Sequence, residues 1–334
     1  MISKKFNHRF GKLLQIILPL FLGISILIWT YHGVDFSRVW SVLTQETNYW
    51  WMLLSLLFGI LSHILRGLRW NLTLEPLGEY PKPTNSIYAV FVSYAANLVI
   101  PRIGEISRCG ILAKYDGVSF SKAVGTVVTE RIIDTLCISI IALITLLLQT
   151  NTFTSFFDKT GTTTAPFTNL FSSNNFYITL ICLAGLTSLF LILFRKLAAS
   201  SKIRQSLSNV VQGCLSLQKV KNLPLFLLYT IGIWVGYFLQ FYIAFFCFEF
   251  SNELGVIAAL VMFVAGSIAV IVPTPNGAGP WHFAIITMMM MYGVSKDNAG
   301  FFALLVHGVQ TILLVLLGIY GLVALPLTNK KQTL

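Results

Sequence analysis

Charged residues are scarce in this sequence of 334 residues. Asp, Glu, Lys and Arg together make up 10% of the chain, whereas hydrophobic residues make up 56% and the mean hydropathy is +0.77. These values lie outside the range of soluble globular domains. Because the bilayer interior offers no hydrogen-bond partners to a backbone, long apolar stretches predict membrane helices. The predicted fold is all-α, a single polytopic membrane helix bundle over residues 1–334.

Acidic residues are scarcer than basic ones, with 12 Asp and Glu against 23 Lys and Arg and a net charge of +11. A nucleic-acid-binding domain would carry its basic residues on a water-facing surface, but here they separate apolar segments. We therefore expect no nucleic-acid partner. We interpret the basic residues as topology signals and as contacts with anionic lipid.

Motifs of common enzyme chemistry are also missing. The five cysteines are scattered singly, and we find no Gly-rich phosphate loop, metal-ligand cluster or nucleophile elbow. We therefore expect no cofactor, no metal and no catalytic residue, and an enzyme is the less favoured interpretation.

Apolar segments recur along the whole chain, at 13–31, 50–68, 85–100, 123–148, 176–194, 224–248, 254–272, 281–292 and 300–325. Four basic residues precede the first of them, which resembles a signal peptide in this respect. That segment is about long enough to span the bilayer, and no cleavage site follows it. We therefore expect it to stay as the first transmembrane helix.

The distribution of Lys and Arg predicts the topology, because cytoplasmic loops collect basic residues. If segment 85–100 enters the membrane and returns, 19 of the 23 basic residues lie on the cytoplasmic face. When the crossings are counted on from there, residues 254–292 begin and end outside. A run of prolines and glycines divides them into two helical pieces. Whether residues 254–272 cross fully stays open.

This topology has about six full crossings and two interrupted segments of opposite orientation, with both termini in the cytoplasm. Interrupted helices of this kind are typical of secondary transporters. The two longest connections are a polar extracytoplasmic loop at 150–175 and a basic cytoplasmic loop at 195–222.

The first candidate site follows segment 85–100, where Pro101 interrupts the helix. Beyond it, Arg102, Glu105 and Arg108 share one helix face, where Glu105 can hold both guanidinium groups in position. Arginine forks match phosphate oxygens and stay charged, so the pair suits a phosphate group. The alternative is a basic collar that anchors this end at the membrane interface.

The second candidate site, Glu130, Arg131 and Asp134, lies inside apolar segment 123–148. An ionisable residue near the bilayer centre costs on the order of 3 kcal/mol, so these three must face partners or a water-filled cavity. Glu130 and Asp134 share a face, and Arg131 can pair with Asp134. A salt-bridge network that locks helices together and a role in substrate or proton coupling both fit this pattern.

The third candidate site is the break at 273–282, which includes Asn276, Gly277, Gly279 and His282. Such a break leaves free carbonyls and an exposed helix N-terminus, which attracts anions such as phosphate. His282 lies in the first turn and can donate to a headgroup or change its protonation state. A simple extracellular turn is the alternative.

Weaker polar signals occur in two other segments. His63, Arg66 and Arg69 form a stripe near the cytoplasmic end of the second segment, and we interpret them as headgroup anchors. His307 and Gln310 form a pair in the last segment that lines a cavity or bonds another helix. We expect the methionines at 288–291 to serve in packing.

These patterns together resemble the lysylphosphatidylglycerol synthase transmembrane family, also called flippase-like domain proteins. The matching residues are Pro101, Gly104, Glu105 and Arg108, then Glu130, Arg131 and Asp134, and then Pro273, Pro275, Gly277 and Gly279. The resemblance covers nearly the whole chain. It implies the membrane half of the enzymes that make and flip aminoacylated phosphatidylglycerol.

Two residues depart from the family pattern. Asn276 stands where many relatives have Gly, and His282 stands where many have Glu. The missing carboxylate argues against recognition of a cationic aminoacyl headgroup. The sequence contains no soluble aminoacyl-transfer domain, so we do not expect synthase activity.

We therefore expect a flippase of the bacterial cytoplasmic membrane that moves a phosphate-bearing lipid between leaflets. The expected substrate-binding residues are Arg102, Glu105, Arg108, Glu130, Arg131, Asp134, Asn276, Gly277, Gly279 and His282. Membrane lipid is the expected partner, and a homo-oligomer is compatible with the sequence. The alternatives are a membrane-embedded lipid-modifying enzyme with Glu130 or His282 as general base, and a scaffold that transports nothing.

Overall fold

The computed structural model of the protein describes residues 2–38, 41–149 and 201–329, and the regular structure within these ranges is all helical. The α-helices are α1 (Ile2–Tyr31), α3 (Tyr49–Leu74), α4 (Pro83–Val99), α5 (Ile103–Asp116), α6 (Phe120–Leu148), α10 (Ser201–Cys214), α11 (Leu223–Ile243), α12 (Glu249–Asn252), α13 (Val256–Ala269), α14 (Pro280–Met291) and α15 (Lys296–Thr328). The predicted all-α membrane bundle is therefore confirmed.

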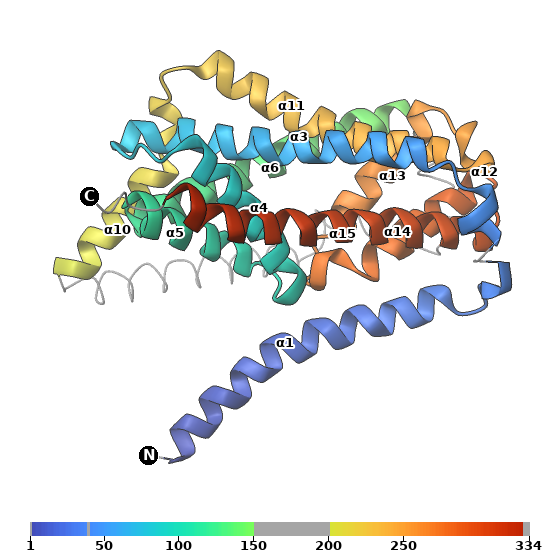
Figure 1. The fold of residues 1–334 in the computed structure, drawn as a ribbon, viewed down its shortest axis with the longest axis horizontal. Coiled ribbons are helices and arrows are strands. Elements are labelled where there is room, and N and C mark those ends of the chain that lie inside the picture. Colours follow the sequence, from blue (N-terminus) through green and yellow to red (C-terminus); the bar gives the residue numbers. More distant parts are fainter. Residues whose placement is uncertain (1, 39–40, 150–200, 330–334) are drawn as a thin grey trace, which may run out of the picture.

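The long helices run side by side along the longest axis of the molecule (Figure 1). Helices α3, α6, α11 and α15 are each long and apolar enough to cross a bilayer. In α1 the described side chains begin at Ile17, and the stretch Ile17–Tyr31 is apolar. The segment 176–194 and the loop 150–175 lie outside the described residues. Helix α1 meets the rest of the bundle near its C-terminal end, where it contacts α14.

Helices α4 and α5 form the first hairpin and pack against each other. Their junction is at Pro101, which has no backbone N–H, and at Arg102, whose φ of 65° lies in the left-handed region. The two helices approach closely at Gly104, where an added Cβ would lie 2.1 Å from the Ser93 carbonyl oxygen. The Asn97 side chain closes the turn by accepting the Gly104 N–H at 2.7 Å. The re-entrant path predicted for segment 85–100 is thus confirmed.

Helices α13 and α14 form the second hairpin, which enters from the opposite end of the bundle (Figure 1). Helix α13 has 14 residues and spans about 21 Å, which is less than the roughly 30 Å of a hydrocarbon core. It ends before the proline- and glycine-rich break, and α14 then packs back against it. Residues 254–272 therefore form the first arm of a hairpin and do not cross fully.

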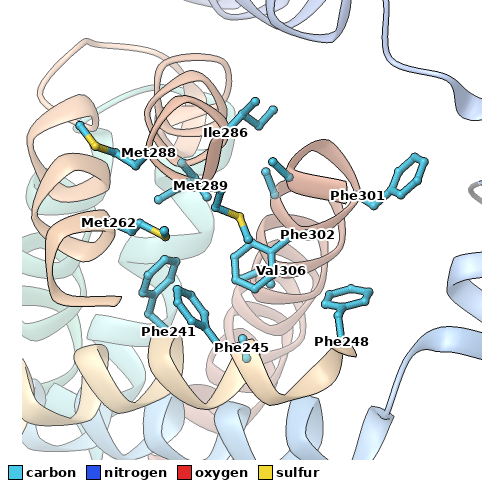
Figure 2. Packing of buried hydrophobic residues seen from close by; sticks show 14 of the residues in the cluster. Phe241, Phe245, Phe248, Met262, Ile286, Met288, Met289, Phe301, Phe302 and Val306 are labelled. Carbon is cyan, nitrogen blue, oxygen red and sulfur yellow. The ribbon is translucent and has the colours of Figure 1, made fainter. Parts of the chain in front are cut away.

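Aromatic and methionine side chains hold the second hairpin in place (Figure 2). Phe302 of α15 lies 6.1 Å from Phe241 and 5.2 Å from Phe245, measured between ring centroids. Met288 and Met289 of α14 are buried in the same cluster, as expected from the sequence. Lipid tails are as apolar as these side chains, so van der Waals packing rather than burial from water holds the hairpin arms in position.

Part of the basic loop expected at 195–222 is helical. Helix α10 packs against α6, and the backbones touch where Gly213 meets Gly125: a Cβ added to Gly125 would lie 2.2 Å from the Val210 carbonyl oxygen. Thr129 of α6 donates a hydrogen bond to the Cys214 carbonyl at 2.9 Å, next to this contact. Small residues that allow close backbone approach explain why this segment docks on the bundle.

Candidate functional site

A buried ion network joins α3, α5 and α6. Glu130 of α6 is fully buried and accepts a hydrogen bond from Arg108 of α5, with 2.6 Å between Nη2 and Oε2. Arg69 of α3 approaches the other carboxylate oxygen, with Nε at 3.6 Å from Oε1. Buried charges of this kind are tolerated only when they are paired. The structure therefore places Glu130 inside a closed set of ionic contacts.

Asp134 lies one turn further along α6 and has three arginine partners. Its carboxylate oxygens lie 2.6 Å from Arg66 Nη1, 2.9 Å from Arg69 Nη2 and 3.4 Å from Arg131 Nη2. The predicted pairing of Arg131 with Asp134 is confirmed. Glu130 and Asp134 share the interior face of α6, as the spacing of four residues predicted.

Arg66 and Arg69 are buried in this network, with exposed fractions of 3% and 0%. Their interpretation as headgroup anchors was therefore wrong. The sequence contained a signal that would have found them, because two carboxylates in one membrane span require cationic partners from other spans. The i, i+3 spacing of the two arginines on a neighbouring apolar segment meets that requirement.

Arg108 faces the interior of the bundle, where its guanidinium lies 4.5 Å from the centre of the Trp70 ring. The Trp70 indole N–H in turn donates to Thr126 at 2.9 Å. Glu105 was expected to orient Arg108 and Arg102, but Arg108 pairs with Glu130, and the nearest cation to Glu105 is Arg131 at 4.0 Å. The turn after Pro101 sets this rotation of α5, which residue spacing alone did not reveal.

A cavity of about 630 Å³ lies where the tips of the two hairpins meet α6. Arg102 and Glu105 line it from the first hairpin, Arg131 from α6, and Thr274, Asn276 and Gly277 from the second. Arg102 is exposed, and 44% of the Arg131 side chain is exposed, whereas Arg108 and Glu130 do not line the cavity. The rest of the lining is largely apolar, so two arginines from different elements face one mainly apolar space.

Four arginines of the network face three carboxylates, so the group formed by Arg66, Arg69, Arg108, Arg131, Glu105, Glu130 and Asp134 has one positive charge in excess. Arg131 is its member that reaches the cavity with a half-exposed guanidinium. A low-dielectric surrounding strengthens the attraction of an anion to this charge. The cavity is therefore suited to an anionic group.

The tip of the second hairpin has an unusual backbone. Asn276 and Gly277 both have positive φ, at 51° and 72°. The Asn276 side chain donates a hydrogen bond to Thr311 of α15 at 3.1 Å, and the Asn276 backbone carbonyl oxygen lies 3.1 Å from His307 Nε2. These bonds to α15 hold a conformation that a non-glycine residue rarely adopts.

Two buried polar atoms lie among the residues that line this cavity. Within the described residues, Glu105 Oε2 and Thr274 Oγ1 have no hydrogen-bond partner. Buried polar atoms are nearly always paired in folded proteins, and exceptions mark sites where a water or a ligand binds. Both atoms lie beneath the cavity surface, and the Glu105 carboxylate oxygen can only accept a hydrogen bond, so neither is a contact for a phosphate group.

Gly279 and His282 lie beside the cavity lining rather than in it. Gly279 packs against α1, since an added Cβ would lie 2.7 Å from the Gly23 carbonyl oxygen. His282 is 4% exposed, accepts the Gly279 N–H at 3.4 Å and lies 4.5 Å from the ring of His307. Of the ten expected residues, the structure therefore brings five together in the cavity lining: Arg102, Glu105, Arg131, Asn276 and Gly277. Three more, Arg108, Glu130 and Asp134, lie in the ion network, and Gly279 and His282 lie at the joint with α1.

Metal chemistry finds no support in the described part of the chain. No group of His, Cys, Asp or Glu within it has the geometry of a metal site. Cys109, Cys137, Cys214 and Cys247 are free thiols.

Comparison with known proteins adds one finding. No curated protein and no solved structure matches this chain. Residues 16–318 match the family described as the lysylphosphatidylglycerol synthase TM region, which covers nearly the whole chain and contains every residue of the network and the cavity. The chain therefore belongs to the lysylphosphatidylglycerol synthase transmembrane-region family, whose membrane domains act on lipids.

Proposed function

We propose that the protein is a flippase, which moves a lipid with a phosphate-bearing headgroup between the leaflets of the bacterial cytoplasmic membrane. One observation carries this proposal: the tips of two oppositely directed hairpins meet at a cavity that two arginines line. Interrupted helices that meet inside a bundle are the usual binding sites of secondary transporters.

Arg102 and Arg131 are the proposed phosphate ligands. Both guanidinium groups reach the cavity, and neither can lose its charge by deprotonation. The sequence suggested Arg108 for this role, but Arg108 pairs with Glu130 and thereby fixes α5 against α6, outside the cavity lining. Glu105 lies 4.0 Å from Arg131 and orients it.

The cavity volume fits a headgroup but not a whole lipid. A space of about 630 Å³ lies within the roughly 300–1,000 Å³ of typical small-molecule sites. We therefore propose that the headgroup travels through the cavity while the acyl chains stay in the hydrocarbon of the membrane.

The distribution of charge supports a cytoplasmic position for both termini. Lys82 and Lys221 lie in the connections at one end of the bundle and Lys122 in the first turn of α6, at the end where α15 also ends. Cytoplasmic loops collect Lys and Arg. The α4–α5 hairpin would then enter from the cytoplasm and the α13–α14 hairpin from outside.

A lipid-modifying enzyme is the second candidate, with Glu130 or His282 as general base. Glu130 is fully buried between two arginines, and His282 does not line the cavity. A general base must reach the proton that it abstracts, so the geometry favours transport. A purified protein that changes the mass of its lipid would instead support the enzyme.

The experiment that tests the proposal is a translocation assay with purified protein in vesicles. Wild type should move fluorescent phosphatidic acid across the bilayer faster than empty vesicles do. Arg131→Gln should slow this several-fold, because the cavity loses the guanidinium that reaches it from the network. Lys221→Gln is the matched control, since Lys221 is an exposed cation outside the cavity.

Equal rates for wild type and Arg131→Gln would refute the role of the cavity arginines. A rate for wild type no higher than that of empty vesicles would refute transport itself and favour the scaffold.

A further inference from the structure

Two histidines lie ring to ring where the second hairpin meets the last helix. His282 of α14 and His307 of α15 have ring centroids 4.5 Å apart; His282 is 4% exposed and His307 is partly buried. We infer, resting on the proposed function, that this histidine pair binds a proton and that proton binding and release there drive the movement of lipid. Histidines inside membrane proteins commonly belong to the proton relays of pumps and transporters.

The backbone contacts of the pair indicate which nitrogen takes the added proton. The Gly279 N–H donates to His282 Nδ1 at 3.4 Å, so the proton of the neutral His282 ring lies on Nε2. His307 Nε2 lies 3.1 Å from the Asn276 backbone carbonyl oxygen, which can only accept, so the neutral His307 ring also carries its proton on Nε2. The lone pair of His282 Nδ1 is engaged by Gly279, and His307 Nδ1 is therefore the site of the added proton.

Few ionisable groups surround the histidine pair. From α1, Tyr31 packs edge-on against His282, with ring centroids 5.8 Å apart. The charged residues of α15 are Lys296 and Asp297, which lie at least about 15 Å from His307 along the helix axis. Among the described residues, no Asp, Glu, Lys or Arg forms an ion pair with either ring. Two positive charges this close would repel each other without a counter-charge, so the pair binds one proton at a time.

The surroundings of the pair stabilise a single positive charge. The centroid of the Trp281 ring lies 5.2 Å from that of His307, within the roughly 6 Å at which an aromatic ring attracts a cation. The hydrogen bond from His307 Nε2 to Asn276 becomes charge-assisted, and such bonds are about twice as strong as neutral ones. Helices α11 and α13, which contact Trp281 through Phe241 and Gly266, carry no charged residue. No ion pair therefore has to break when the proton leaves.

Asn276 connects the histidine pair to the cavity. Its left-handed backbone is held by two bonds to α15, one to His307 and one to Thr311. A protonated His307 holds the tip of the second hairpin more firmly against α15, and loss of the proton weakens that bond. Asn276 shares the lining of the cavity and of a smaller adjoining space with six titratable groups: Arg102, Glu105, Arg131, Tyr94, His63 and Tyr237. The proton thus controls how firmly the tip is held at the place where the headgroup binds.

A pocket of about 360 Å³ at the joint of α1 and α14 adjoins the pair. Thr30 and Phe283 line it, and they are the chain neighbours of Tyr31 and His282. In the topology proposed above, this pocket faces the outside of the cell. A proton from external water reaches the pair from this pocket, binds to His307 Nδ1 and later leaves from the same nitrogen to water in the cavity. No other covalent bond forms or breaks.

The test measures lipid movement under a proton gradient. Full-length protein is placed in phosphatidylcholine vesicles with fluorescent phosphatidylmethanol, a phosphate diester whose charge stays constant near neutral pH. Valinomycin and potassium hold the membrane potential at zero, so that the pH difference alone acts. The gradient should accelerate movement by wild type several-fold over vesicles at equal pH, whether acidic or neutral. Empty vesicles should show no acceleration.

His307→Gln should move the lipid at the same rate with and without the gradient, because a carboxamide still donates to the Asn276 carbonyl but takes up no proton. Thermal unfolding shows whether this variant folds. If it does not, His282→Gln takes its place and should weaken the response, since the path from the pocket passes this ring. His32→Gln is the matched control, an exposed histidine at the same joint but outside the pair, and it should respond as wild type does.

An undiminished response in His307→Gln, or in His282→Gln where His307→Gln does not fold, would overturn the proton site. A wild type that the gradient does not accelerate would overturn it as well. The proposed function survives either result if wild type still moves lipid faster than empty vesicles do. A wild-type rate no higher than that of empty vesicles, with and without the gradient, would overturn the proposed function and this inference with it.

Discussion

The two hairpins enter the bundle from opposite ends, but their tips differ in chemistry. The tip of α4–α5 carries Arg102 and Glu105, and its second arm sends Arg108 into the ion network. The tip of α13–α14 carries no charged residue and relies on left-handed backbone at Asn276 and Gly277. The first hairpin therefore contributes charged side chains to the cavity, and the second contributes a specific backbone conformation. Mutations in the two tips should accordingly fail in different ways.

The largest effect is expected from breaking the ion network behind the first hairpin. Arg108→Ala leaves Glu130 buried without its closest partner, and removing one member of a buried pair typically costs about 3–5 kcal/mol. Thermal unfolding in detergent should show a strongly destabilised protein. The double variant Arg108→Met, Glu130→Leu should regain most of that stability, because well-packed apolar side chains often replace buried ion pairs at little cost.

A double variant as unstable as Arg108→Ala would show that Glu130 and Arg108 are not an energetic pair. Full transport by the double variant would show that the pair serves only the packing of α5 against α6.

The close contact between α4 and α5 should be almost as sensitive. Gly104→Ala puts a Cβ 2.1 Å from the Ser93 carbonyl oxygen, so the hairpin must open at a cost of about 1–3 kcal/mol. Gly110→Ala is the control on the same helix, since nothing lies within 4 Å of its added Cβ, and it should be neutral or slightly stabilising. Equal melting temperatures for the two variants would contradict the packing of this hairpin.

The second hairpin should respond to backbone shape rather than to charge. Gly277→Ala forces an alanine to φ 72° and brings its Cβ to 2.8 Å from Val270 Cγ2, which we expect to cost about 1–3 kcal/mol. Gly293→Ala has a similar φ of 88° but nothing within 4 Å, so it isolates the conformational part of the cost. Transport should fall more in Gly277→Ala than in Gly293→Ala, because Gly277 alone of the two lines the cavity.

The smallest effect is expected at the exposed ion pair between Lys221 and Glu75. The two side chains meet at 3.1 Å but are 69% and 35% exposed, and exposed pairs contribute little. Glu75→Gln should leave thermal unfolding and transport nearly unchanged. A large loss of stability in that variant would mean that charge at the bundle end matters as much as charge in the network.

The sequence was sufficient to predict the two helix breaks and the buried carboxylates. Pro101 and the run of prolines and glycines after residue 272 mark breaks that no continuous helix accommodates. Glu130 and Asp134 had to find partners because hydrocarbon cannot solvate a carboxylate. These conclusions depend only on the type of each residue and on its neighbours in the chain, which can be read from the sequence.

The partners themselves could not be assigned from the sequence. Arg108 was expected to bind phosphate but pairs with Glu130, because the rotation of α5 after the turn directs it into the bundle. Arg131 of α6 keeps its predicted pairing with Asp134 and also lines the cavity. The small space lined by His63, Tyr94, Tyr237 and Gln310 likewise draws on α3, α4, α11 and α15, helices that are distant in the chain. Spacing within one helix contains no information on such contacts.

The most direct test of the central claim is photocrosslinking in membranes with a phospholipid that carries a diazirine beside its phosphate. Peptide mapping should find adducts on both hairpin tips, near Arg102 and near Thr274, and Arg131→Gln should reduce both together. Adducts confined to the outward-facing surface of the long helices, unchanged in Arg131→Gln, would contradict a headgroup site between the hairpins.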